Sequence, residues 1–550
     1  MRFPRRFSCV LVSFFLAIPC LLPAKEPPQT HSIDPSWKAK LFGMRGFPAI
    51  PPGMTEAKFF PLVDEFGQYR HADWPGKIHN AAELAAARTA EADDLTRHPG
   101  PVGWDMYGGW AAGPQLAATG RFRTEKHDGR WWLVDPLGRL FWSHGIDCVE
   151  TYWSTTPITD RENWFSGLPL KDSPPGKFYG EGNWAPHNYY EGRRYENFSF
   201  SAANLQRKYG PDAWRTFHDL IHRRLQSWGM NTLGNWSQES ICRMRKTPYV
   251  VTLHSGGRRL QGSEGYWGQF ADVFDPSFAE SIRADLARHQ AEANDPWCLG
   301  CFVDNELGWG SDVSLAEAAL MSPADQPAKR AFVAQLREKY GPIAQLNTAW
   351  GTKYASWNAL LESRKKPDAK RAHDDLAAFA FTTAKTYFHI CRDEVKRSAP
   401  QTLYLGCRFA WVNDPAVRAA GEYCDVISFN RYQKDVASLN LPAKTVDRPM
   451  MIGEFHFGAL DRGMFHTGLV ATASQHERAE AYRTYVRSAI RHPNIVGTHW
   501  FEFGDEALTG RGDGENYQIG FVDVCDTPYA ETIAASRDIG AEMYVLRQQK

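Results

Sequence analysis

The chain has 550 residues, of which 63 are lysine or arginine and 63 are aspartate or glutamate, so its formal net charge is zero. A neutral chain lacks the excess of basic residues that neutralises nucleic-acid phosphates, and we expect no nucleic-acid partner. With 43% hydrophobic and 13% aromatic residues the chain can bury a large core, which excludes a disordered or fibrous polymer.

Residues 1–24 have the features of a secretory signal peptide. The basic residues Arg2, Arg5 and Arg6 precede an apolar run over residues 9–22, and Ala24 supplies a small residue at its end. No other apolar run reaches the ~20 residues of a membrane helix, so we expect no membrane span. The sequence predicts a periplasmic or secreted protein and leaves its oligomeric state open.

Residues 25–100 are rich in proline and other helix breakers, and we expect an extension, with one helix over 81–96, that wraps the remainder of the chain. Strand and helix patterns alternate after it. Eight strands are predicted, over residues 140–148, 231–236, 249–255, 298–306, 403–409, 426–432, 450–457 and 496–503. Most are nearly continuous apolar runs, as in a sheet covered on both faces. The sequence therefore predicts the α/β class: a (β/α)8 TIM barrel over residues 101–550, with long inserts after strands one and four.

Ten cysteines are spread thinly along the chain, which is not the pattern of a disulfide framework. Cys298 and Cys301 form a C-x-x-C pair, a spacing typical of redox and zinc sites. This pair lies inside an apolar run, and no second pair of ligands accompanies it. We therefore interpret both as small buried side chains, and expect no metal site and no cofactor.

Two glutamates emerge from apolar strands at the carboxyl edge of the predicted barrel, where active sites of this fold lie. Glu306 ends strand four and Glu454 ends strand seven. Burying a carboxylate is costly unless it has a partner or a task. Hydrolysis of a glycosidic bond requires two such carboxyl groups facing each other. Asn305, beside Glu306, adds an amide that is suited to bind the sugar hydroxyl next to the reacting carbon.

Three strings of this sequence, FVDNELGWG, IGEFHFGAL and GTHWFEFGDEALTGRGDGENYQIGF, resemble those of the β-agarases of glycoside hydrolase family 50. The segment AFVAQLREKYGPIAQLNTAWGTKYASW also resembles the helical insert of that family and of the family 42 β-galactosidases. The likeness runs from about Phe59 to the C-terminus. It implies a retaining hydrolase of galactose-containing polysaccharides, with Glu306 as acid/base and Glu454 as nucleophile.

Agarases of this family commonly carry a carbohydrate-binding β-sandwich ahead of the barrel, and too few residues precede Phe59 to build one. We therefore expect an exo-acting enzyme whose partner is a galactan or a soluble agar-derived oligosaccharide. An aromatic-rich insert over residues 152–195 is suited to close one end of the substrate site.

Further strand-end residues are predicted to bind substrate. In similar enzymes a tyrosine at the position of Tyr432 donates a hydrogen bond to the nucleophile, and the indole of Trp500 is suited to lie flat under a sugar ring. In a glycine-rich acidic loop beyond Trp500 we favour contacts to sugar hydroxyls over a calcium site. The remaining predicted substrate ligands are His144, Asn235, Trp236, His254, Asn430, Glu515 and Asn516.

Three alternatives remain: a β-galactosidase that acts on other galactosides, a non-catalytic sugar-binding barrel, and a metal-dependent hydrolase. A barrel that has lost catalysis tends to lose a carboxylate, and both are present here. No His-x-His or H-E-x-x-H pattern appears, so the third alternative is the least favoured.

Overall fold

The computed structural model describes residues 43–549, so the predicted signal peptide lies outside the described residues. Eight parallel strands form one sheet in the order β11-β10-β9-β8-β4-β14-β13-β12. A parallel bridge between Phe409, which follows β11, and Phe429 of β12 closes this sheet, which confirms the predicted (β/α)8 barrel. The barrel strands are β4 (Ser143–Ile146), β8 (Thr232–Leu233), β9 (Tyr249–Leu253), β10 (Cys298–Val303), β11 (Leu403–Tyr404), β12 (Ile427–Asn430), β13 (Met450–Phe455) and β14 (Ile495–Trp500).

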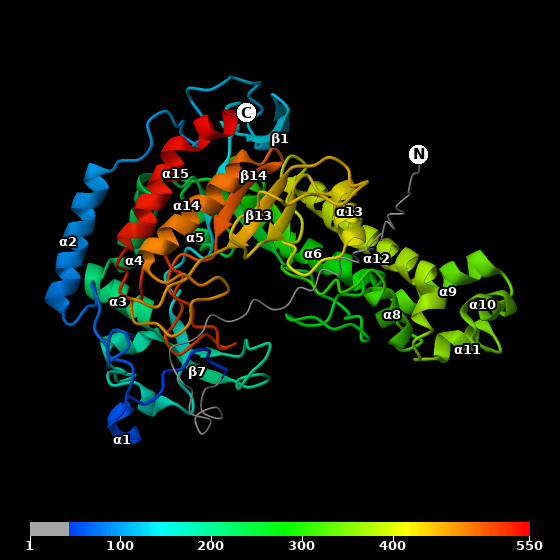
Figure 1. The fold of residues 1–550 in the computed structure, drawn as a ribbon, viewed down its shortest axis with the longest axis horizontal. Coiled ribbons are helices and arrows are strands. Elements are labelled where there is room, and N and C mark those ends of the chain that lie inside the picture. The colour runs from blue at the N-terminus through cyan, green and yellow to red at the C-terminus, as the bar shows by residue number, and fades with distance from the viewer. Residues whose placement is uncertain (1–42, 550) are drawn as a thin grey trace, which may run out of the picture.

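Helices cover the outer face of the barrel (Figure 1). Their starts follow local rules: Asp275 caps α6 through Ser277 N at 3.0 Å with Pro276 at the first position, and Ser474 caps α14 through Glu477 N at 3.2 Å. Because both faces of the sheet are covered, every residue of β10 is buried. The covering helices are α4 (Ala213–Ser227), α5 (Glu239–Cys242), α6 (Pro276–Arg288), α7 (Gln290–Ala293), α12 (Ala369–Ser398), α13 (Asp414–Tyr423), α14 (Gln475–Arg491) and α15 (Ala530–Gln548).

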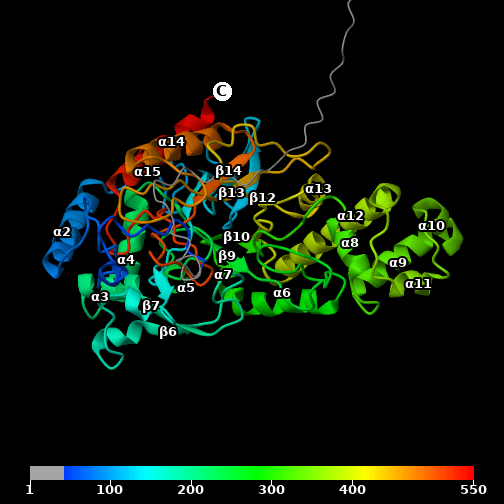
Figure 2. The same cartoon turned by 60° about the horizontal axis from the view of Figure 1, so that its bottom comes forward.

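Two inserts interrupt the barrel, one after β4 and one after β10. The insert after β4 contains a small antiparallel sheet and α3, and the insert after β10 contributes a helical projection beside α12, at the right of Figures 1 and 2. Their elements are β5 (Thr155–Pro157), η2 (Glu162–Trp164), η3 (Pro174–Phe178), β6 (Tyr179–Gly182), β7 (Tyr195–Ser199), α3 (Phe200–Tyr209), α8 (Ser314–Met321), α9 (Pro327–Tyr340), α10 (Ile343–Trp350) and α11 (Trp357–Glu362).

The apolar run over residues 140–148, predicted as one strand, is two. β3 (Leu140–Phe141) pairs with β2 (Arg130–Val134), which pairs with β1 (Arg123–His127) in a separate antiparallel sheet, whereas β4 belongs to the barrel. Both sheets bury their residues here, so hydrophobicity does not mark the boundary.

The described cysteines are all free, and both residues of the C-x-x-C pair are buried, which confirms the interpretation of these two as buried side chains. In the part of the chain that the structure describes, no helix is both long and apolar enough to cross a membrane.

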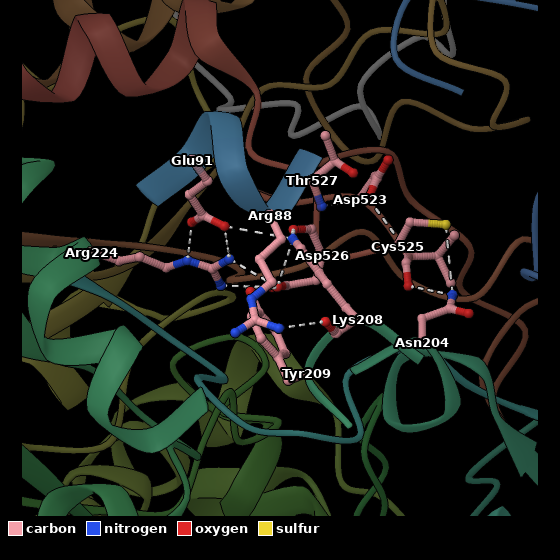
Figure 3. Close-up of polar contacts among 11 residues, drawn as sticks. Arg88, Glu91, Asn204, Lys208, Tyr209, Arg224, Asp523, Cys525, Asp526 and Thr527 are labelled. Atoms are coloured by element: carbon pink, nitrogen blue, oxygen red, sulfur yellow. Dashed lines mark hydrogen bonds and ion pairs between the residues drawn. The ribbon is translucent and has the colours of Figure 1, made fainter. Parts of the chain in front are cut away.

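The segment before the barrel contains α1 (Glu56–Phe59) and α2 (Ala81–Arg97), and α2 lies against α3 and α4. A buried ion cluster joins these helices to the loop before α15 (Figure 3). Arg224 of α4 contacts Glu91 of α2 at 2.6 Å and Asp526 at 2.6 Å, and Lys208 of α3 contacts Asp526 at 3.0 Å. Burial raises the pKa of Asp526, but the charges of Arg224 and Lys208 outweigh it and the pKa is lowered.

We expect Asp526→Asn to lower the free energy of unfolding by about 3 kcal/mol or more, because it removes one of the two buried carboxylates, Asp526 and Glu91, that Arg224 and Lys208 share. Chemical denaturation measures this loss. The control is Asp219→Asn, which removes one partner of an exposed pair with Lys246 at 2.8 Å and should cost less than about 1 kcal/mol. Equal losses in the two variants would contradict a stabilising role of the cluster.

Candidate active site

The two predicted glutamates lie at the carboxyl edge of the barrel, Glu306 just beyond β10 and Glu454 within β13. Both are almost fully buried, with 7% and 4% of their surfaces exposed. Buried carboxyl groups require partners, and the partners of these two differ in kind. Their surroundings therefore give them different chemical properties.

Glu306 has uncharged hydrogen-bond donors. The indole Nε1–H of Trp267 donates to Oε2 at 2.9 Å, and the amide Nδ2 of Asn430 donates to Oε1 at 2.8 Å. Burial, followed by the negative charge of Glu454, raises the pKa of Glu306 to about 7. A carboxyl group with this pKa holds a proton near neutral pH and is suited to donate it.

Glu454 has a cation and a phenol as partners. The guanidinium Nη2 of Arg408 donates to Oε1 at 2.6 Å, which is a charge-assisted hydrogen bond. The hydroxyl of Tyr432 donates to Oε2, which is the contact expected from the sequence. Both partners hold the carboxylate in one orientation and stabilise negative charge on it, as a nucleophile requires.

A continuous network of hydrogen bonds joins the two carboxyl groups. Arg408 Nε donates to Asn305 Oδ1 at 2.9 Å, and Asn430 Nδ2 also donates to this oxygen at 3.1 Å. Glu306 and Glu454 are thus linked through Asn430, Asn305 and Arg408. Because both bonds use the amide oxygen of Asn305, its orientation is fixed with the NH2 group directed away from this pair of donors.

Arg408 also contacts a third buried carboxyl group, Asp147, which follows β4. Nη2 donates to Asp147 Oδ2 at 3.0 Å, and the backbone N–H of Asn235 donates to Asp147 Oδ1 at 2.7 Å. Burial is the largest influence on Asp147 and raises its pKa to about 7, against the opposing charge of Arg408. Burial lowers the pKa of Arg408, but the charges of Asp147 and Glu454 raise it more, so the guanidinium stays charged.

The backbone at these strand ends is shaped to fit the network. A Cβ on Gly453, the residue before Glu454, would lie 2.9 Å from Asn430 Oδ1 and 3.0 Å from Arg408 Nη1. Asn430 and Arg408 can approach only because this residue is glycine. Glu306 and Arg408 themselves have φ of 50° and 55°. Such left-handed conformations are unfavourable for residues other than glycine and are concentrated at functional sites.

Two other predicted ligands lie beside the network. The guanidinium of Arg408 lies over the ring of Trp236 at 4.8 Å. Asn235 is buried, and its Oδ1 accepts a hydrogen bond from Thr252 at 2.5 Å, while its Nδ2 has no partner among the described residues. The side chain of His254 is exposed, and its role in binding substrate stays a prediction.

The predictions for His144 and Trp500 as direct sugar ligands are wrong. Trp500 is fully buried, and its Nε1 donates to the carbonyl of Ile519 at 2.8 Å, so the ring has no free face for a sugar. The two nitrogens of His144 contact Gly229 O at 2.6 Å and Tyr482 Oη at 2.5 Å. Both side chains pack against Tyr482 of α14, outside the barrel. Neighbouring residues of a strand point to opposite faces, and these two positions face the helices instead of the barrel interior.

In the acidic loop, Asn516 is fully buried and its Nδ2 donates to the carbonyls of Arg45 at 3.1 Å and Leu508 at 3.3 Å. It supports the loop, and the prediction that it contacts sugar directly is wrong. Glu515 pairs with Arg511 and retains 14% exposure of its side chain. Within residues 43–549 no group of His, Cys, Asp or Glu side chains is arranged to hold a metal ion.

Three residues of the site were not anticipated. Arg408 and Asp147 are charged residues at the ends of apolar strands, the same signal that identified the glutamates. Applied to every strand, that signal predicts both. Trp267 lies in the loop after β9, with no regular pattern around it, and only the tertiary structure brings it to Glu306.

A (β/α)8 barrel with two buried carboxyl groups at its carboxyl edge, one protonated near neutrality and one paired with a cation, has the architecture of the barrel glycoside hydrolases. A sequence model of glycoside hydrolase family 42, described as β-galactosidase, matches residues 244–458. A solved structure described as an exo-β-agarase superimposes with a TM-score of 0.85 at 34% identity, covering 91% of this chain and 75% of that one. The chain belongs to glycoside hydrolase family 50, the family of the β-agarases.

Two curated relatives come from Vibrio sp. (strain JT0107). β-Agarase B is 37% identical over 92% of this chain, and β-agarase A is 35% identical over 89%. The chain spans 57% and 52% of the lengths of these relatives, little more than half of each.

Proposed function

We propose that the protein is a retaining glycoside hydrolase that cleaves β-galactosidic bonds in agar-type poly- or oligosaccharides. The observation that carries this proposal is the contrast between Glu306, whose pKa is raised to about 7, and Glu454, which is hydrogen-bonded to Arg408 and Tyr432. These are the properties of an acid/base and of a nucleophile.

In the first step Glu454 attacks the anomeric carbon while Glu306 transfers its proton to the glycosidic oxygen, so that the C–O bond breaks and the leaving sugar departs with a new hydroxyl group. In the second step Glu306, now a carboxylate, takes a proton from water, and the resulting hydroxide displaces Glu454 from the anomeric carbon. Two inversions give net retention. This chemistry requires carboxyl groups ~5–5.5 Å apart, and the bridging network from Glu306 to Glu454 supports this proximity.

Several side chains are proposed to hold the substrate: Asn305, Asn430, Asn235, Trp236, His254 and Glu515. The fixed amide oxygen of Asn305 leaves its NH2 group to donate to a sugar hydroxyl. The ring of Trp236 and the unpartnered Nδ2 of Asn235 lie at the adjoining strand ends. Asn430 bonds directly to Glu306, which supports a place for these side chains beside the two carboxyl groups.

The names of the relatives support agar as the substrate, and the name of the exo-β-agarase structure supports release of products from a chain end. The match of residues 244–458 to the family 42 model favours a second candidate, a β-galactosidase that acts on other galactosides. The leader-like residues 1–24 support action in the periplasm or outside the cell.

An activity screen on agarose, porphyran, their oligosaccharides and aryl β-galactosides tests these proposals. We expect short products of uniform size from agar-type chains, a slow fall in agarose viscosity, and a first product that retains the β configuration in NMR spectra. A mixed ladder of products with rapid loss of viscosity would contradict exo action. Cleavage of aryl β-galactosides alone would favour the second candidate.

The pH dependence of kcat/KM should report the proton on Glu306. Because only the protonated acid can assist the leaving group, activity should fall as the pH rises through about 7. Glu306→Ala should remove this limb, reduce kcat by about 10²–10⁴-fold on poor leaving groups, and recover activity with azide on activated aryl glycosides. Equal loss on all leaving groups without azide rescue would contradict the acid/base role.

A further inference from the structure

Four exposed or half-buried aromatic rings form a contiguous strip beside Glu306. Consecutive ring centroids are 6.3 Å apart from Trp184 to Trp267, 4.7 Å from Trp267 to Tyr266, and 5.7 Å from Tyr266 to Trp411. Trp184 is 53% exposed, Trp411 48% and Tyr266 40%. Single exposed aromatic side chains are common on protein surfaces, but a contiguous group of them marks a binding surface.

The strip is assembled from three separate loops. Trp184 belongs to the insert after β4, Tyr266 and Trp267 follow β9, and Trp411 follows β11. β9 and β11 are the two strands that flank β10, from which Glu306 emerges. The nucleophile strand, β13, lies on the other side of the barrel, between β12 and β14. The aromatic strip therefore lies on the acid/base side of the two carboxyl groups.

The strip is joined to the catalytic machinery and held in place. The hydrogen bond of Trp267 Nε1 to Glu306 Oε2, at 2.9 Å, joins the middle of the strip to the proton-donating carboxyl group. Arg511 lies over the ring of Trp184 at 5.8 Å, and the hydroxyl of Tyr266 is 3.2 Å from Nε2 of His187. These contacts orient the rings before any ligand binds.

We propose that the aromatic strip is the binding site for the sugar rings on the leaving-group side of the scissile bond. In the proposed mechanism Glu306 protonates the oxygen of the departing sugar, so this sugar must lie next to Glu306 and the following sugars must extend along the strip. The apolar C–H faces of galactose rings pack on indole and phenol rings, and the polar edges of the rings remain hydrated. This inference rests on the proposed function. It specifies where, along the bound oligosaccharide, the retained part ends and the departing part begins.

The test uses a Glu454→Gln background, in which bound oligosaccharides are not consumed, and titration calorimetry with agar-derived tetra-, hexa- and octasaccharides. We expect affinity to increase with length, and Trp184→Ala and Trp411→Ala each to weaken binding of the octasaccharide by about three- to tenfold, with a smaller loss for the tetrasaccharide. Trp357→Ala is the matched control, because Trp357 is a half-buried tryptophan of α11, in the helical projection at the right of Figure 1, with no role in the proposed site. It should change no affinity.

Loss of affinity that is equal at all lengths, or no loss in either variant, would overturn the assignment of the strip. Kinetics of the same substitutions with an intact Glu454 test the two proposals separately. If the unsubstituted enzyme cleaves no agar-derived substrate, the proposed function is wrong. If agar-derived substrates are cleaved, and Trp184→Ala and Trp411→Ala leave the dependence of cleavage on oligosaccharide length unaltered, only the assignment of the strip is wrong.

Discussion

Glu454→Gln is expected to reduce kcat by roughly 10⁴-fold or more, because the amide cannot form the glycosyl ester through which a retaining hydrolase acts. Glutamine has nearly the shape of glutamate, and its carbonyl oxygen can still accept a hydrogen bond from Arg408 or Tyr432. The fold should therefore persist. Hydrolysis of an aryl β-galactoside and of an agar oligosaccharide, with a thermal unfolding curve for each protein, measures the effect.

The matched control is Glu181→Gln, which makes the same chemical change at an exposed position in β6. It should leave kcat within about twofold of the unsubstituted enzyme. A folded Glu454→Gln protein that keeps more than a few per cent of activity would show that another group forms the covalent intermediate.

Arg408 is the second residue whose replacement should have a large effect. Its guanidinium holds Glu454, Asn305 and Asp147 at once, and lies wholly inside the protein. Arg408→Met should lower the free energy of unfolding by about 3–5 kcal/mol, since two buried carboxyl groups lose their cation. Arg408→Lys keeps the charge but loses the planar fork of donors, so we expect a smaller loss of stability and a fall in kcat of about 10²-fold or more.

A pH profile separates positioning of the nucleophile from a purely structural role. The charge of Arg408 lowers the pKa of Glu306, so its removal in Arg408→Met should raise that pKa and move the basic limb of kcat/KM to higher pH. Arg408→Lys should move the limb less and should affect kcat more than KM. An unshifted limb in Arg408→Met, or a change in KM alone for Arg408→Lys, would contradict the positioning role.

The sequence by itself determined the barrel and the two catalytic candidates, for related physical reasons. Parallel strands covered on both faces must be apolar along their whole length, so the strands stand out as continuous runs such as that of β10. A carboxyl group at the end of such a run is conspicuous because its burial is costly without a partner. The same reasoning extends to Arg408 and Asp147, although their mutual contact does not follow from it.

Only the tertiary structure decided which strand-end side chains face the site. A shift of one residue in a short strand moves a side chain from the barrel interior to the helices, which is why Trp500 and His144 face α14 while His499, next to Trp500, bonds to Ser143 inside the barrel. The loops are less predictable still: Trp184, Tyr266, Trp267 and Trp411 meet because three loops converge. The hydrophobic pattern fixes which segments are buried, whereas register and the paths of loops depend on long-range packing that no local pattern encodes.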